Sequence, residues 1–137
     1  MSDAVHTIPA RTGEKTIDSE HDVQLQLLDS LTRTLTKGDG IAAASYILDQ
    51  FIEFSDMHFL SEQLVMRLHG YPGYEPHLEE HTRLMRKVRE IRSNIQHGDR
   101  QIGLQLILEL RDWLLTHIAS EDVAFGEFLK NKVGDPA

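Results

Sequence analysis

The sequence has no cysteine and only one tryptophan among its 137 residues. Without cysteine, the chain can form no disulfide, no thiolate metal site and no cysteine nucleophile. It also lacks any apolar run near the roughly 20 residues that a membrane-spanning helix needs. Residues 1–20 contain no apolar core of the kind found in secretion signals. These absences predict a protein that does not enter a membrane, and we expect it in the cytoplasm.

Positive charge is scarce as well, since 14 Lys and Arg residues face 22 Asp and Glu residues and the net charge is −8. The densest basic run extends from Arg83 to Arg92, but Glu79, Glu80 and Glu90 flank or interrupt it. This pattern indicates a solvated helix face, and we expect no nucleic-acid partner. The length suits one domain, and a hydrophobic content of 40% is typical of a soluble globular protein.

Apolar residues recur at helical spacing through most of the chain, without a useful stretch of strand-like alternation. Glycine-containing turns divide this pattern, and Pro76 suits the first turn of a helix. Either Asp18 or Ser19 can cap the first helix. The short turns predict antiparallel neighbours and therefore an all-α, up-down-up-down antiparallel four-helix bundle. We expect helices over about 18–35, 41–68, 76–96 and from about residue 100 onward.

At the level of domains, we expect an extended N-terminal arm, one bundle and a short tail. The arm covers residues 1–16, the bundle 17–133 and the tail 134–137.

Histidines occupy inward positions on all four predicted helices. Two pairs of polar residues are spaced four apart, so each pair shares one helix face. Burying so many polar groups without partners would cost on the order of 1–3 kcal/mol each. A shared metal site removes that cost, although a single histidine on such a stripe is more often a hydrogen-bonded core residue. The candidate ligands are His21, His58, Glu62, His77, His81, His117 and Asp122.

Five imidazoles and two carboxylates suit iron, manganese or zinc. Seven ligands exceed the usual coordination number of one ion, which indicates a pair of metal ions. On a regular α-helix the five-residue step from His117 to Asp122 rotates the side chain by about 140°. We therefore expect a π-bulge or a helix end near Ala119, which would bring both residues to one side.

The pattern resembles that of the hemerythrin and bacteriohemerythrin family. His21, His58-x3-Glu62, His77-x3-His81 and His117-x4-Asp122 carry the resemblance, which extends from about Ile17 to Leu129. Tyr71-Pro72 in a turn and Trp113-Leu114 before His117 agree with it. Myohemerythrin is itself an example of the up-down-up-down bundle, so the resemblance and the expected fold are linked.

This resemblance implies two non-haem iron ions with an oxo or hydroxo bridge. His77, His81 and His117 would hold one iron, His21 and His58 the other, and Glu62 and Asp122 would bridge them. Leu114 and Ile118, with Phe59 or Trp113 close by, would form the oxygen pocket. The implied function is reversible binding of molecular oxygen for carriage, storage or delivery, which is not an enzymatic role.

Two alternatives stay open. The same site could serve an oxygen- or redox-sensing domain of a signalling protein, so the chain is expected to be a monomer or one part of a larger chain. A di-iron oxidase is less favoured, because no histidine has a glutamate three residues before it, as the ferritin-like Glu-x-x-His motif requires. We expect none of His6, His69 and His97 to bind the metal pair. Glu20 and Gln63 depart from the usual residues of the family without replacing a ligand.

Overall fold

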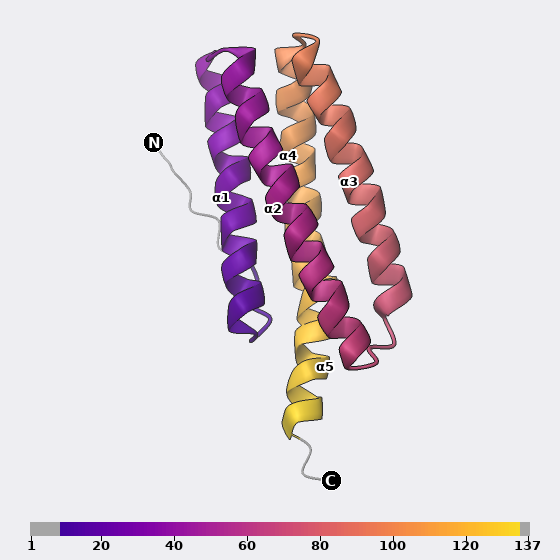
Figure 1. The fold of residues 1–137 in the computed structure, drawn as a ribbon. Coiled ribbons are helices and arrows are strands. Elements are labelled where there is room, and N and C mark those ends of the chain that lie inside the picture. Colours follow the sequence, from indigo (N-terminus) through magenta and orange to yellow (C-terminus); the bar gives the residue numbers. More distant parts are fainter. Residues whose placement is uncertain (1–8, 135–137) are drawn as a thin grey trace.

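The computed structural model describes residues 9–134, which form a four-helix bundle (Figure 1). Among these residues α1 contacts α2 and α4, and α3 contacts α2 and α4, so the helices form a closed ring of neighbours. The fourth helix of the bundle continues without a break through α4, η1 and α5. The elements are α1 Lys15–Lys37, α2 Ile41–Leu68, α3 Tyr74–Gln96, α4 Arg100–His117, the π-helix η1 Ile118–Asp122 and α5 Val123–Gly134.

The bundle confirms the fold expected from helical periodicity. Helix α1 ends at Gly38, whose φ of 80° is left-handed, and this glycine's amide donates to the carbonyl of Leu35. The predicted arm and tail fall partly outside the described residues, because residues 1–8 and 135–137 are not among them. The proposed division into arm, bundle and tail therefore stays a prediction.

The start of the first helix differs from the prediction. Helix α1 begins at Lys15, and its N-cap residue Glu14 makes no side-chain capping bond. The carboxylate of Asp18 instead accepts hydrogen bonds from the Thr12 amide at 2.8 Å and the Thr12 hydroxyl at 2.9 Å. Asp18 therefore fixes the segment before the helix rather than capping it, and the cap predicted at Asp18 or Ser19 was wrong.

The described part of the N-terminal segment lies against α5. Gly126 is buried, and a Cβ atom at this position would collide with the backbone carbonyl of Thr12. Only a residue without a side chain lets the two backbones approach so closely. Gly126 thus allows the segment around Thr12 to lie directly against the last helix.

Two hydrophobic clusters lie at different heights along the bundle. The larger one fills the half that ends at the α1–α2 and α3–α4 turns, and it includes Leu28, Phe51, Ile91 and Ile107. The smaller one consists of Ile17, Met66, Phe125 and Leu129. Along α1, α2 and the fourth helix of the bundle, the candidate metal ligands lie where these two clusters meet. The core is therefore layered, with polar groups between two apolar parts.

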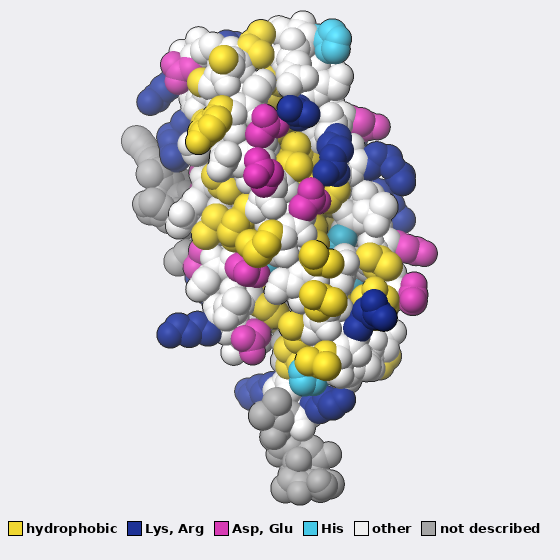
Figure 2. Space-filling view, in the orientation of Figure 1, with side chains coloured by type: hydrophobic (Ala, Val, Ile, Leu, Met, Phe, Trp, Pro, Cys, Tyr) yellow, Lys and Arg dark blue, Asp and Glu magenta, His cyan; other side chains and the backbone are white. Residues whose placement is uncertain are grey.

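The basic run on α3 pairs with acidic residues of α2. Arg92 lies 2.7 Å from Asp49, and Arg89 lies 3.0 Å from Asp56. In Figure 2, acidic and basic side chains lie next to one another on the upper part of this face, and hydrophobic side chains gather below them. This arrangement agrees with a solvated helix face. Among the residues described, no helix is both long enough and apolar enough to cross a bilayer.

Candidate metal centre

All seven side chains selected from the sequence meet in the polar layer. Their exposed fractions range from 0% for His21 and His58 to 3% for His117. Each comes from the inward face of its helix, where apolar residues one turn away pack in the clusters above and below. Seven titratable side chains are almost never buried together so completely unless a partner compensates for the water that they lose.

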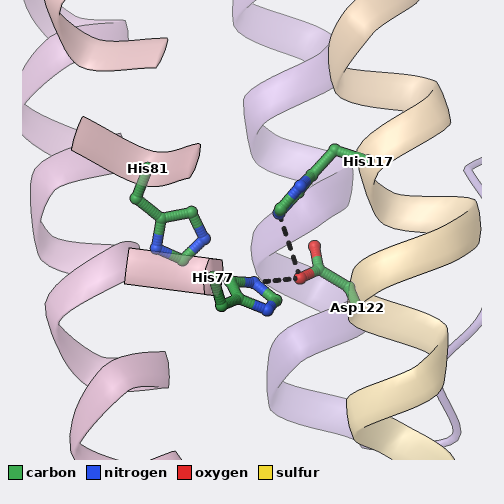
Figure 3. Close-up of side chains that lie close together, drawn as sticks. All are labelled: His77, His81, His117 and Asp122. Carbon is green, nitrogen blue, oxygen red and sulfur yellow. Dashed lines mark ion pairs between the residues drawn. The ribbon is translucent and has the colours of Figure 1, made fainter. Parts of the chain in front are cut away.

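The seven residues form two adjoining groups of candidate ligands. The first group contains His77, His81, His117 and Asp122, and the second contains His21, His58 and Glu62. Within each group one ligand atom per residue lies within 4.8 Å of the others. Figure 3 shows the first group, with the two imidazoles of α3 facing His117 and Asp122.

Each carboxylate faces both groups with different oxygens. Oδ1 of Asp122 lies 2.9 Å from Nε2 of His77 and 3.3 Å from Nε2 of His117, whereas Oδ2 lies 2.9 Å from Nε2 of His21. Oε1 of Glu62 lies 3.0 Å from Nε2 of His77, and Oε2 lies 3.9 Å from Nε2 of His58. This division of the two oxygens is the geometry that a carboxylate bridging two metal ions requires.

The π-helix η1 explains how His117 and Asp122 can belong to one group. It spans Ile118–Asp122, so the wider turn absorbs the extra residue between the two ligands. Sequence spacing predicted a π-bulge or a helix end near Ala119, and the structure has the first of these.

Three polar side chains contact the outer Nδ1 atoms of the histidines. Nδ1 of His58 lies 2.6 Å from Oε1 of Glu20, and Nδ1 of His117 lies 2.9 Å from Oε1 of Glu80. The amide of Gln63 lies 3.0 Å from Nδ1 of His81. When Nδ1–H of His58 or His117 donates to its carboxylate, the lone pair of Nε2 faces the centre, as a metal ligand requires.

These outer contacts were not predicted from the sequence. From the sequence, Glu20 and Gln63 stand out only as departures from the family, and Glu80 only as a charge beside the basic run. A usable signal existed, because each of the three directly precedes or follows a candidate ligand, at His21, Glu62 and His81 respectively.

The histidines and carboxylates alter one another's protonation. Burial disfavours the charged form of His77, but Asp122 and Glu62 outweigh it and raise its pKa to about 9. Burial prevails at His81 and lowers its pKa. For Asp122, burial is opposed by His117, His21 and His77, which together hold its pKa well below the ordinary value. At Glu62, burial and Asp122 are outweighed by His77, His81 and His58, which lower its pKa. Both carboxyl groups therefore favour the anionic form that metal ligands need.

The candidate ligand atoms are not oriented to form hydrogen bonds with one another. Within the described residues, Nε2 of all five histidines and both oxygens of Glu62 are buried without a hydrogen-bond partner. Close approach without hydrogen-bonding geometry leaves a large uncompensated cost, since buried polar atoms are normally paired. Metal ions between these atoms would remove the cost, so the residues present fit a metal pair.

The residues expected around bound oxygen lie next to this layer. Leu114, Ile118 and Phe59 are buried, whereas Trp113 is only partly buried. Phe59 stacks on His81 with ring centres 3.8 Å apart, and Trp113 stacks on His117 at 4.9 Å. Both aromatic rings therefore support histidines of the first group, and the assignment of an oxygen pocket stays a proposal.

The remaining histidines lie apart from the two groups. His97 is exposed, and its Nδ1 lies 2.7 Å from the carbonyl of Ser93. His69 is the C-cap of α2 and belongs to neither ligand group. His6 lies outside the described residues.

The fold and the site define a class of protein, namely four-helix bundles whose core contains a buried cluster of histidines and carboxylates that could hold metal ions. The family model of the hemerythrin HHE cation binding domain matches residues 12–129. The chain therefore belongs to the hemerythrin family, which implies a non-haem iron site.

Curated relatives and a solved structure agree with this assignment. The chain is 27% identical to a bacteriohemerythrin of Methylococcus capsulatus over 112 residues, which cover 82% of this chain and 85% of the relative. It is 29% identical to a bacteriohemerythrin of Stenotrophomonas maltophilia, covering 86% and 76% of the two chains. A crystal structure of wild-type hemerythrin superimposes with a TM-score of 0.77 at 26% identity, covering 85% of this chain and 88% of that one.

Proposed function

We propose that this protein binds molecular oxygen reversibly at a pair of iron ions held by the seven residues of the polar layer. The observation that carries the proposal is the division of the two carboxylates, each of which presents one oxygen to each group of histidines. Such a pair supplies, when bound, the two electrons that reversible oxygen binding requires. The proposed role is carriage, storage or delivery of oxygen.

The unequal numbers of histidines support an open position on one side. His77, His81 and His117 belong to the first group, whereas only His21 and His58 belong to the second. If both carboxylates were shared, a second ion held by His21 and His58 would have one protein ligand fewer than the first. We therefore propose that oxygen and other external ligands bind at the ion held by His21 and His58.

The surrounding side chains favour binding without further chemistry. Five imidazoles and two carboxylates make the site poorer in anionic ligands than the carboxylate-rich sites of ferritin-like di-iron proteins. Fewer anionic ligands stabilise high-valent iron less well. Leu114 and Ile118 are fully buried beside His117, and we expect these apolar side chains to limit the access of water. We therefore propose binding rather than catalysis.

Anaerobic reconstitution with ferrous iron tests the proposal. We expect two iron ions per chain, visible absorption on addition of oxygen, and loss of that absorption when oxygen is removed. A stoichiometry of one ion in the folded protein would contradict the di-iron centre. Irreversible consumption of oxygen, with two ions bound, would instead contradict carriage and favour oxidase chemistry.

A further inference from the structure

A cavity of about 320 Å³ lies between the start of α1, the second half of α2 and α5. Three glutamates and one histidine contribute to its wall, together with Ser61 and several apolar side chains. The four are Glu14, Glu20, Glu62 and His69. None of the sequence patterns discussed above identifies this cavity.

The glutamates of the cavity reach from the surface to the metal centre. Glu14 is exposed, Glu20 is partly buried, and Glu62 is 2% exposed. Both oxygens of Glu62 lack a hydrogen-bond partner within the described chain. Glu20 contacts His58, so the inner end of the cavity adjoins the second ligand group. The wall thus carries a series of carboxylate groups that ends at Glu62, a proposed metal ligand.

The charge of the cavity suits cations. Carboxylate and imidazole donors bind divalent first-row metals, and several carboxylates in a recess raise the local concentration of cations. The cavity between α3 and α4 is different, because Arg83, Lys87 and Glu109 all contribute to its wall. One positive charge opposes the pattern, since Nζ of Lys132 donates to the carbonyl of His69 at 2.7 Å.

We propose that the cavity beside α1 is the path by which divalent metal ions reach and leave the buried centre, with Glu14 and His69 as transient outer ligands. The proposal rests on the metal centre proposed above. It assigns to these two residues a kinetic role that is separate from final coordination.

A residue on an entry path should affect the kinetics of metal binding differently from a permanent metal ligand. A group that contacts the ion only in transit lowers the barrier for uptake and release alike, so its loss slows both rates and leaves the dissociation constant unchanged. A permanent ligand, by contrast, changes the dissociation constant. The ratio of the two rates therefore separates the two roles.

Glu14→Gln is the principal test. The side chain of Glu14 makes no capping bond, and its backbone carbonyl still accepts from Asp18, so the variant should fold normally. We expect uptake of cobalt(II) by the metal-free 137-residue chain to slow about two- to five-fold, with a weaker dependence on salt. Release from the cobalt-loaded protein, at a chelator concentration that no longer affects the rate, should slow by the same factor.

Glu109→Gln is the matched control, because it removes the same charge from the cavity between α3 and α4. Its uptake and release rates should equal those of the parent protein. Lys132→Gln removes the opposing charge and should accelerate both processes. Equal rates in Glu14→Gln, Glu109→Gln and the parent would overturn the proposal.

Ser61→Leu tests the path by filling it. We expect slower uptake and release of cobalt(II) with two ions still bound at equilibrium. If this variant slows the reaction with azide but not metal exchange, the cavity admits small ligands and the proposal is wrong. A parent protein that binds no metal pair would instead contradict the proposed function, so the two failures can be distinguished.

Discussion

At the scale of single residues, His77 and His81 show most directly what the polar layer requires. Their Nε2 atoms lie 3.0 Å and 3.3 Å from Oε1 of Glu62, with 1% and 2% of the residues exposed. His77→Ala or His81→Ala should reduce bound iron from two ions toward one, because each removes a ligand of the same group. Metal analysis of purified protein measures this. His97→Ala, at an exposed helix end, is the control and should keep both ions; equal iron in all variants would contradict the ligand assignment.

The protonation of His77 predicts how metal affinity depends on pH. Its pKa rises from the ordinary 6.5 to about 9 in the metal-free fold, so it is protonated at neutral pH and must lose that proton when metal binds. Affinity should therefore increase with pH and level off above about 9. The charged form stabilises the metal-free fold fully below pH 6.5, and this contribution is lost as the pH rises through 9.

Proton release on cobalt(II) binding, followed with an indicator, checks this pH dependence. We expect more protons released per chain at pH 7.5 than at pH 9.5. A constant value between these two pH values would show that His77 is already neutral in the metal-free protein.

Leu114 is the residue whose truncation tests the proposed oxygen pocket. It is fully buried and lies one turn before His117. Leu114→Ala should leave a cavity costing roughly 2–5 kcal/mol and admit water and anions to the centre. We expect faster autoxidation and faster reaction with azide, measured by stopped-flow, with both irons bound. Leu110→Ala, at another buried position of the same helix and cluster, controls for the cavity alone; unchanged rates in Leu114→Ala would place the pocket elsewhere.

The sequence predicts the parts of the site that depend on spacing within one helix better than the contacts between helices. The seven candidate ligands could be selected because helical periodicity converts a spacing of four into a shared face. The contact of Glu20 with His58 joins α1 to α2, and that of Glu80 with His117 joins α3 to α4. Such contacts depend on how helices rotate against each other, which periodicity alone leaves open.

At the scale of elements, the four helices followed from apolar spacing, whereas the start of α1 did not. Asp18 and Ser19 have the side chains of good N-caps, but Asp18 binds the backbone and hydroxyl of Thr12 instead. Propensity describes what a residue can do locally, and here a contact with the preceding segment decides its role. The π-helix η1 was one of two expected solutions, and only three-dimensional packing selects between them.

Gly126 provides a test of how the N-terminal segment is held against α5. In the full chain, Gly126→Ala should lower the free energy of unfolding by about 1–3 kcal/mol, because the new methyl group meets the backbone of Thr12 and no side chain can move aside. In a chain without residues 1–13, the same change should stabilise the protein by about 1 kcal/mol, since alanine favours a helix more than glycine does. Denaturant unfolding of the four proteins measures both effects, and the same sign in both backgrounds would exclude the close backbone contact.

At the scale of the whole molecule, the position of the polar layer determines which parts of the bundle should loosen when metal is removed. The larger hydrophobic cluster holds one end of the bundle with apolar contacts from all four helices. Among the described residues, the buried centre of the smaller cluster consists of Ile17, Met66, Phe125 and Leu129. The end that contains it therefore depends more on the ligands that connect the helices just above it.

Removal of iron by a chelator should affect the two ends differently. Without metal, His21 and Asp122 still attract each other, but most donor atoms of the layer lose their partners. We expect backbone amides near the smaller cluster, in residues 15–20, 62–74 and 123–132, to exchange with solvent much faster. Amides around Leu28, Phe51 and Ile91 should change less, because the larger cluster remains packed.

Hydrogen exchange followed by mass spectrometry, on the loaded and metal-free protein, measures this difference. The expected ratio of exchange rates is larger at the end with α5 than at the end with the α1–α2 turn. Reloading with cobalt(II) should restore protection, since binding to the folded state adds to its stability. Uniform acceleration over all helices would show that the bundle unfolds as one unit and that the metal layer does not divide it.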